Sequence, residues 1–372
     1  MKLLYAFPEP LPLPRARGIQ AVNAVAALAA TGVEIDFCFV PCAQGDPFAY
    51  YQIAKPESVN LLPLSRALPW PMHRVHSNRF FAARLQRRFN LGQQMIMVRH
   101  LKLAAWLANH PSKPKYIYEA HEVFADTAPG AKAQARREEE ARVMRSASAV
   151  VANCAATAQR LVTLFGSPRV LQVIPNGVNR PEDLSAKNWA KPEAHIVYSG
   201  SLFPWKGAHD LVAAARYLPG CRIDIVGGEA DRLLELQALV PTSGASIKFA
   251  GQLSHRDAME RVMSACIAVL PNRADPDSAF TSPIKLFEYM AAGCAIVASD
   301  LPAMREILAD DEVMWSKPGD PGSIAEAIKA LVGDPARARR MGERVREKSR
   351  QYTWQTRAAR VMALLSNIGA HP

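Results

Sequence analysis

Short apolar segments alternate with segments of helical periodicity along almost the whole chain, and this alternation constrains the fold more than any other feature. Short apolar strands that alternate with helices indicate parallel sheets covered by helices on both faces. Ligands of such sheets bind beyond the carboxyl ends of the strands. We expect strands at Leu3–Phe7, Val33–Val40, Ser58–Leu62, Tyr116–Glu119, Ala149–Asn153, Val170–Ile174, Ile196–Tyr198, Arg222–Val226, Ser246–Phe249, Ile267–Leu270 and Ala295–Ala298.

The alternation is interrupted by a polar, proline-containing stretch from Asn179 to Ala194, whose lack of periodicity is typical of a linker. A chain of 372 residues has the length of two ordinary domains. We therefore expect an α/β protein with two doubly wound domains and a binding site in the cleft between them. The expected helices are Ile19–Ala30, a basic helix from about Pro71 to Asn90, a further helix ending at Asn109, Ala131–Ser146, Ala156–Leu164 and helical segments after Asp334.

Composition agrees with a folded globular protein, since 49% of the residues are hydrophobic and 21% are charged. No apolar run reaches the roughly 18 residues that a transmembrane helix needs. Six scattered cysteines, mostly within apolar runs, indicate reduced core thiols, no zinc site and a cytoplasmic location. The formal net charge of +11 suits nucleic acid, an anionic membrane surface or phosphorylated substrates. The basic residues are dispersed without an aromatic platform, which argues against nucleic acid.

The sequence GSLFPWKG, Gly200 to Gly207, lies between an expected strand and an expected helix. It contains neither the GxxxxGK[ST] of a P-loop nor the GxGxxG of a dinucleotide site. A lysine just before a helix N-terminus is nevertheless well placed for a phosphate, because free N–H groups and the helix dipole favour an anion there. Lys206 is therefore either a phosphate ligand or a solvated loop lysine.

The sequence SPIKLFEYMAAG, which starts at Ser282, predicts a second helix that begins at the same edge of the sheet. Ser282 is a good N-cap residue, and Pro283 suits the first helical position. Helical periodicity places Glu288 near the face shared with Ile284 and Lys285. The mostly apolar neighbours of Glu288 favour a partly buried carboxylate that accepts hydrogen bonds from ribose hydroxyls. The alternative is a surface glutamate paired with a lysine.

Two features lie near expected strand ends in the first domain. His121, in the sequence YEAHE, follows a strand and belongs at the carboxyl edge of the first sheet. A histidine there either contacts a sugar or phosphate or is a structural residue with its hydrogen bonds satisfied; Glu119 and Glu122 are alternative contacts. Gly18 lies between the first strand and the first helix, where a glycine either lets a ligand approach the backbone or makes a turn.

Together these segments resemble the retaining glycosyltransferases of family 4, which have the GT-B fold. GSLFPWKG resembles the family's GxLxxxKG element, and SPIKLFEYMAAGCAIVASDLPAMREI resembles its acidic helix with the strand and loop that follow. IPNGV resembles the end of the family's first domain, FAGQLSH the loop that borders the nucleobase, and YTW the start of the final helix. The resemblance implies an N-terminal acceptor-side Rossmann-like domain at 1–178, a C-terminal nucleotide-sugar donor domain at 179–350, and a last helix, 351–372, that crosses back to the first domain.

The resemblance also implies roles for individual residues. Lys206 would neutralise the donor diphosphate, Glu288 would bind the ribose hydroxyls, and His121 would contact the donor sugar. The other expected substrate-binding residues are Gly18, Gly200, Ser201, Gly207, Gly228, Gln252, Arg273, Ser282, Pro283, Ile284 and Lys285. The donor would be a sugar nucleotide of the UDP or GDP type, and the resemblance implies no metal and no further cofactor.

The chain departs from the family pattern at two positions. Many members carry an arginine where this chain has Ser201 and a glutamate where it has Phe280. Lys285 or Arg273 could supply the missing positive charge, whereas the nearby aspartates do not stand at the position of the missing acid. These two substitutions leave the sugar undetermined and raise one alternative, a non-catalytic binder of sugar nucleotides.

The basic stretch HRVHSNRFFAARLQRRFN, His73 to Asn90, bears on the acceptor. A helix of this composition either lies on anionic lipid at the inner face of a membrane and reaches a lipid-linked acceptor, or is an ordinary helix with a solvated cationic face. A growing glycan or a soluble metabolite is an alternative acceptor. The expected setting is the synthesis of cell-surface polysaccharide, lipopolysaccharide or glycolipid, and the most distant alternative function is nucleic-acid binding.

Overall fold

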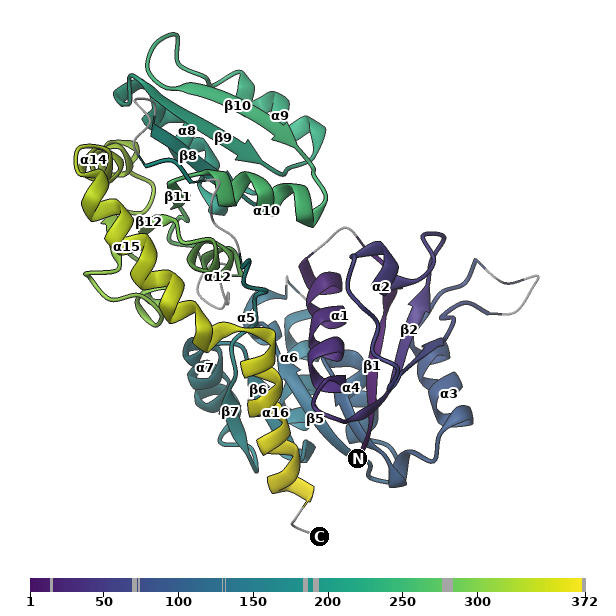
Figure 1. Cartoon of the computed structure of the whole chain (residues 1–372). Helices are drawn as coiled ribbons and strands as arrows, with labels where there is room; N and C mark the ends of the chain where they lie inside the picture. The colour runs from purple at the N-terminus through teal and green to yellow at the C-terminus, as the bar shows by residue number, and fades with distance from the viewer. Residues whose placement is uncertain are drawn as a thin grey trace. The chain divides into compact units, whose positions relative to one another are not determined.

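The computed structural model describes residues 1–13, 16–68, 72, 74–128, 130, 132–182, 187–189, 194–275 and 284–369. The chain divides into two compact units, each with its own parallel sheet (Figure 1). Unit 1 consists of Met1–Gly177 together with Trp354–Pro372, and unit 2 is the intervening Val178–Thr353. The last helix of the chain therefore belongs to the same unit as the first strand.

The sheet of unit 1 has the strand order β3-β2-β1-β4-β5-β6-β7 within the described residues, and every neighbouring pair is parallel. The order reverses between β1 and β4, because the chain leaves β1 toward β2 and leaves β4 toward β5. The strands are β1 Lys2–Leu11, β2 Glu34–Pro41, β3 Val59–Pro63, β4 Met95–Val98, β5 Lys115–Ala120, β6 Ala149–Ala152 and β7 Leu171–Val173. The helices are α1 Ala16–Ala29, α2 Pro47–Tyr50, α3 Asn78–Arg88, η1 Leu91–Gln93, α4 Leu101–Ala108, α5 Phe124–Thr127, α6 Lys132–Ser146, α7 Ala155–Phe165 and α16 Trp354–Gly369.

The sheet of unit 2 has the order β10-β9-β8-β11-β12-β13 in the part of the chain that is described, again with parallel pairs throughout. Its order reverses between β8 and β11. The strands are β8 Ala194–Ser199, β9 Cys221–Val226, β10 Ser246–Gly251, β11 Ile267–Leu270, β12 Ala295–Ser299 and β13 Val313–Ser316. The helices are η2 Pro204–Lys206, α8 Ala208–Ala214, η3 Ala215–Tyr217, α9 Ala230–Gln237, α10 His255–Ser264, α12 Ile284–Ala291, α13 Pro302–Arg305, α14 Pro321–Val332, α15 Pro335–Lys348 and η4 Ser349–Tyr352.

The central strands are buried on both faces, which is why they read as continuous apolar runs in the sequence. In unit 2, one apolar cluster packs α8 and α14 on the sheet, and a second packs α10 and α12 on its opposite face. Local signals set the helix ends: the carboxylates of Asp320 and Asp334 accept N–H hydrogen bonds at the starts of α14 and α15, each followed by proline. This scaffold holds the loops at the strand ends.

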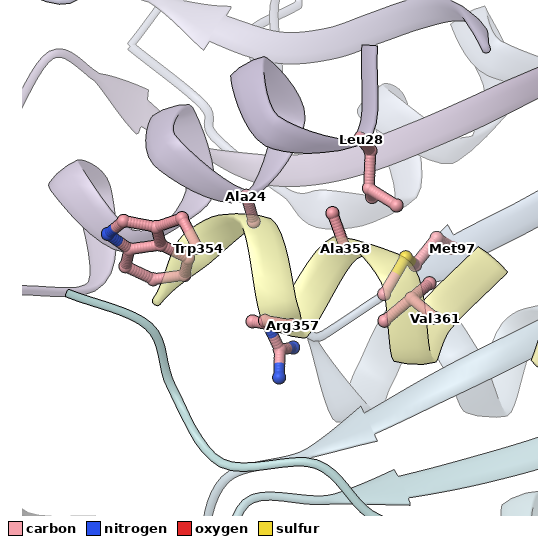
Figure 2. Close-up of a pocket in the computed structure, with 7 residues that line it drawn as sticks. All are labelled: Ala24, Leu28, Met97, Trp354, Arg357, Ala358 and Val361. Atoms are coloured by element: carbon pink, nitrogen blue, oxygen red, sulfur yellow. The ribbon is translucent and has the colours of Figure 1, made fainter. Parts of the chain in front are cut away.

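The helix α16 packs against α1 and β4 of unit 1 (Figure 2). The gap between them is too small to admit a water molecule, so it is a packing defect and not a ligand site. Figure 2 shows Arg357 pointing away from α1, and its guanidinium donates to the carbonyl of Ile174 at 2.7 Å and to the buried carboxylate of Glu119. The gap is lined by Ala24, Leu28, Met97, Trp354, Arg357, Ala358 and Val361.

The strands expected from the sequence are present, but two further strands were not predicted. β4 is four residues long and lies in a region expected to be helical up to Asn109, and β13 lies beyond the last expected strand. A four-residue apolar run has no measurable period, so sequence cannot distinguish such a strand from a buried piece of helix. The basic helix is also shorter than expected: α3 begins at Asn78, and the segment before it contains an antiparallel bridge from His76 to Ala67.

Candidate functional site

The loops that follow β8 and β11 meet where the strand order of unit 2 reverses. The chain leaves β8 through Gly200 and Ser201, makes the short 3-10 helix η2 that ends at Lys206, and enters α8. The backbone N–H of Arg273, beyond β11, donates to the carbonyl of Trp205 at 2.9 Å. Lys206 is therefore held at the position where open parallel sheets bind their ligands.

Glycines allow these loops to pack backbone against backbone. Gly207 has φ +72°, and a Cβ atom there would lie 1.8 Å from the carbonyl oxygen of Pro271. Gly228, beyond β9, has φ +92°, and its Cβ would lie 2.2 Å from the Leu202 side chain. At both positions the backbone is left-handed and there is no space for a Cβ atom, so each of these two facts alone favours glycine. Gly207 and Gly228, which were expected to bind substrate, are thus also needed for the packing of these loops.

Lys206 is a half-buried cation without a carboxylate partner anywhere in the described residues. Its ammonium nitrogen lies 3.9 Å from the centroid of the Trp205 ring, a favourable cation–π contact. Burial, together with the nearby positive charge of Lys285, lowers the pKa of Lys206 from 10.5 to about 8. An ammonium placed this way has lost part of its hydration. An anion bound beside it would replace the lost interaction with water.

Glu288 is buried in α12, and its carboxylate has two basic partners. Lys285 Nζ lies 2.7 Å from Oε2, and His255 Nε2 lies 3.2 Å from Oε1. Burial alone would raise the pKa of Glu288, but the charges and hydrogen bonds of Lys285 and His255 lower it to about 2. The carboxylate is thus ionised at neutral pH and able to accept hydrogen bonds.

The neighbour of Glu288 on α12 ties this helix to the loop that carries Lys206. The hydroxyl of Tyr289 accepts a hydrogen bond from the N–H of Ser199 at 2.7 Å, at the end of β8. Tyr198 donates to the carbonyl of Ser201 at 2.6 Å and so fixes the next turn. The structure therefore brings Lys206, Lys285 and Glu288 together, and their role in binding a donor stays a prediction.

The two residues considered as replacements for the missing arginine differ in their surroundings. Arg273 donates to the buried carboxylate of Asp210 at 2.8 and 2.7 Å, an ion pair that links the β11 loop to α8. Lys285 is half-buried and acts electrostatically on Lys206, whereas Ser201 is exposed. Of the two candidates, Lys285 is the one whose charge reaches Lys206.

The remaining expected residues of this site lie around the same loops or outside the described part. Gln252 is exposed just after β10, and Gly227 N–H donates to the carbonyl of Gly251 at 2.7 Å, which brings the β9 and β10 loops together. Ile284 is the first described residue of α12. Three positions discussed for this site lie outside the described residues: Phe280, Ser282 and Pro283. Pro71, His73 and Ala131, at the expected starts of other helical segments, also lie outside them.

His121 lies where β5 ends in unit 1, as expected. The amide of Asn153, beyond the neighbouring strand β6, donates to the backbone carbonyl of His121 at 3.0 Å. Burial, with the positive charges of Arg99 and Arg357, holds the pKa of His121 well below its usual value of 6.5. Its imidazole is neutral and has no hydrogen-bond partner among the described residues, so one ring nitrogen can donate and the other can accept.

Gly18 lies inside α1 and not in a turn before the first helix, so its expected position was wrong. Its small size has a structural explanation. A Cβ atom at this position would lie 2.2 Å from the hydroxyl of Tyr51 and 3.1 Å from Leu13. The same hydroxyl donates to the carbonyl of Leu13 at 2.6 Å. The glycine makes room for this contact; its expected proximity to a ligand stays a prediction.

The helix α3 presents its charges to solvent and its apolar side chains to the interior. Phe81 and Leu85 are buried, while Arg79, Arg87 and Arg88 are exposed. The apolar face is therefore packed on unit 1, and contact of the exposed cationic face with anionic lipid stays a prediction. No helix in the described ranges is both long enough and apolar enough to span a membrane.

The described residues contain no group of three or more His, Cys, Asp or Glu side chains placed to hold a metal ion. Sequence reasoning missed three residues that the structure puts to use: His255 and Trp205 in unit 2, and Arg99 in unit 1. His255 lies at the end of the FAGQLSH loop, so its position in the sequence was a signal. Trp205 and Arg99 had no such signal in the sequence, and only their contacts in the folded chain mark them as candidates.

Two protein families match the chain by their sequence models. The family described as "Glycosyl transferases group 1" matches residues 179–348. The family described as "Glycosyltransferase Family 4" matches residues 18–181. The first match contains Lys206 and Glu288, and the second contains His121.

Curated relatives match part of the chain. A glycogen synthase of Mycobacterium tuberculosis is 27% identical over 224 residues, covering 58% of this chain and 53% of the relative. A phosphatidyl-myo-inositol mannosyltransferase of Mycobacterium leprae is 32% identical over 206 residues, covering 52% of this chain and 53% of the relative. The chain thus spans about half the length of the curated relatives it matches.

Solved structures match the fold over the whole chain. A sucrose-phosphate synthase from Thermosynechococcus elongatus has a TM-score of 0.78 at 18% identity and covers 100% of both chains. Anabaena HepE, solved in complex with UDP and glucose, has a TM-score of 0.75 at 16% identity and covers 99% of this chain and 100% of its own. At these identities the similarity is one of fold.

Proposed function

Because the chain belongs to the glycosyl transferases of group 1 and family 4, we propose that it transfers a sugar from a nucleotide diphosphate donor to an acceptor hydroxyl. Its fold is of the GT-B type, with two Rossmann-like domains. The donor is a UDP- or GDP-sugar, with UDP the first to test because HepE was solved with UDP and glucose. The product belongs to polysaccharide, lipopolysaccharide or glycolipid synthesis.

The observation that carries this proposal is Lys206, which has no carboxylate partner among the described residues and lies at the strand-order reversal of unit 2. Lys285 acts on it electrostatically, and the ionised carboxylate of Glu288 lies 2.7 Å from the Lys285 ammonium. The two ammonium groups suit a diphosphate, and the carboxylate suits a pair of ribose hydroxyls. One nucleoside diphosphate therefore carries groups complementary to all three side chains. Backbone N–H groups near Ile284 and a sugar contact by His121 complete the proposal, and they rest on the family resemblance.

The proposed reaction breaks the bond between the anomeric carbon and the donor phosphate oxygen, and the electron pair stays with that oxygen. A bond forms between the anomeric carbon and the acceptor oxygen, whose proton passes to the leaving phosphate. Lys206 and Lys285 stabilise the negative charge that develops on the diphosphate, an electrostatic contribution preorganised by the folded loops. Retention at the anomeric carbon and independence from metal ions are parts of the proposal that rest on the resemblance.

The test is a thermal-shift titration of the wild type and Lys206→Ala with UDP, GDP, ADP and their sugar conjugates. A ligand at about 100 times its dissociation constant stabilises a protein by roughly 2.7 kcal/mol. One nucleotide should stabilise the wild type and not the variant. Lys317→Ala, which removes an exposed lysine elsewhere in unit 2, is the control and should respond like the wild type. If no nucleotide stabilises the wild type, the donor site is wrongly assigned.

A second measurement separates an enzyme from a protein that only binds sugar nucleotides. Release of the nucleoside diphosphate from the stabilising donor is followed with and without EDTA, using glycan, lipid-linked and small-molecule acceptors. Turnover that requires an acceptor and resists EDTA supports the proposal. Binding without turnover on any of these acceptors would instead support the non-catalytic binder.

A further inference from the structure

A second cation that has no carboxylate partner in the described part of the chain lies where the strand order of unit 1 reverses. Arg99 directly follows β4, and its guanidinium donates to the side-chain oxygen of Gln20, on α1, at 2.6 Å. α1 is the helix that follows β1, so the two residues bridge the two strands at which the order changes. Open parallel sheets bind ligands at this point. Among the described residues, Arg99 forms no ion pair.

The carboxylates near Arg99 are already held by other arginines. Glu9 pairs with Arg17 at 2.7 Å. Glu119 is buried, pairs with Arg357, and accepts the hydroxyl of Tyr5 at 2.8 Å. Two negative charges thus face three guanidinium groups, and one positive charge is left over on Arg99.

The two neighbouring histidines, His121 and His100, are neutral and so leave the charge around Arg99 unchanged. Burial, with positive charges that include Arg99, lowers the pKa of His121 well below 6.5. Burial, with Lys102, Arg136, Arg17 and Arg66, lowers the pKa of His100 to about 4. Burial also lowers the pKa of the Arg99 guanidinium itself, against the pull of Tyr5, Glu119 and Glu9. Among the described residues, the ionised groups that act on Arg99, together with Arg99 and Arg357, therefore carry a net positive charge.

We infer that Arg99, steadied by Gln20, is a specificity-determining residue that binds an anionic group, a phosphate or a carboxylate, on the acceptor. The inference rests on the proposed function, since it assigns the chemical class of that reaction's acceptor. A guanidinium has five N–H donors in a planar fork, and Gln20 accepts one of them. The others suit two oxygens of a phosphate or carboxylate. A neutral glycan would leave the excess charge of Arg99 unbalanced.

The test uses three probes with one sugar ring: methyl α-D-glucopyranoside, its 6-phosphate, and the corresponding glucuronide. Their affinities for the full-length wild type, Arg99→Gln and Arg99→Lys are measured by calorimetry. The wild type should bind an anionic probe more tightly than the neutral sugar, and Arg99→Gln should lose tenfold or more of that affinity while binding the neutral sugar unchanged. Arg99→Lys should keep part of the affinity for the anionic probe, because lysine has the positive charge of arginine but not its planar pair of N–H donors. The phosphate and carboxylate arms tell a phosphorylated acceptor from an acidic sugar.

Arg88→Gln is the matched control, because it removes an exposed arginine of α3 in the same unit. It should bind all three probes like the wild type. Equal loss for neutral and anionic probes in Arg99→Gln would mean that Arg99 only supports the structure, and would overturn the inference. So would a wild type that shows no preference for either anionic probe. UDP binding is measured on the same samples: its absence refutes the proposed donor site, whereas UDP binding without anion preference refutes this inference alone.

Discussion

The ammonium of Lys285 lies 2.7 Å from the carboxylate of Glu288, one turn further along α12. This pair differs from the many exposed ion pairs of the protein because the Glu288 side chain is 5% exposed, and because its other oxygen lies near His255. The pair keeps the Glu288 carboxylate ionised at acidic pH. It also orients Lys285 beside Lys206. An isolated lysine and glutamate at this spacing on a surface would contribute little to stability.

Stability should therefore depend on Glu288 between pH 5 and pH 2. Its folded-state pKa is about 2, below the ordinary 4.5, so the stabilisation is present above pH 5 and is lost as the pH falls through this window. The shift corresponds to at most about 3 kcal/mol. Denaturant unfolding of Glu288→Gln should show a deficit at pH 6 that shrinks toward pH 3. Glu326→Gln, which removes the exposed partner of Lys329, should show almost no deficit at either pH.

Nucleotide affinity should fall as the pH rises above 8. A bound diphosphate raises the pKa of Lys206 from its free value of about 8, so binding takes up a proton above that pH. The association constant should fall by up to tenfold per unit between pH 8 and pH 9.5, a range in which the phosphate no longer titrates. Calorimetry in buffers of different ionisation enthalpy measures the proton directly. Lys206→Arg stays charged and should abolish this slope; an unchanged slope would exclude Lys206 as its origin.

Gly207→Ala should destabilise unit 2 much more than Gly220→Ala. Both glycines have a left-handed backbone, with φ +72° and +75°. The new methyl group at 207 would lie 1.8 Å from the Pro271 carbonyl oxygen, whereas nothing lies within 4 Å at 220. Backbone strain alone costs about 1–2 kcal/mol at either site, so the excess at 207 measures the clash. Equal losses in urea unfolding would show that the β11 loop moves aside freely.

Arg357→Ala should be among the most destabilising single substitutions in unit 1. It leaves the carboxylate of Glu119 buried without its arginine and removes the donor to the Ile174 and Pro175 carbonyls. Breaking a buried ion pair on one side costs about 3–5 kcal/mol. Arg360→Ala, on the exposed side of the same helix, should cost less than about 0.5 kcal/mol. Thermal unfolding of both variants makes the comparison, and similar midpoints would contradict the anchoring role of Arg357.

The sequence predicted the sheets well because central parallel strands are apolar on both faces, and this leaves a clear signature. The strands it missed are short: β4 and β13 have four residues each, too few for a period to be read. Lys206 and Glu288 could be found because each lies next to a recognisable helix start. Arg99 could not, since it stands in an ordinary run after an unpredicted strand. Its significance depends on Glu9 and Glu119 being held by Arg17 and Arg357, which only the folded chain reveals.

The chain enters unit 1, leaves it at Gly177 and returns at Trp354. During synthesis, the strands of unit 1 therefore emerge long before the helix α16 that covers them. At about 5–20 residues per second, the intervening unit takes on the order of 10–35 s to translate. Through that interval the nascent first unit exposes the surface that later buries Val361, Leu364 and Leu365. Unit 1 therefore completes its fold only after the whole of unit 2 has been synthesised.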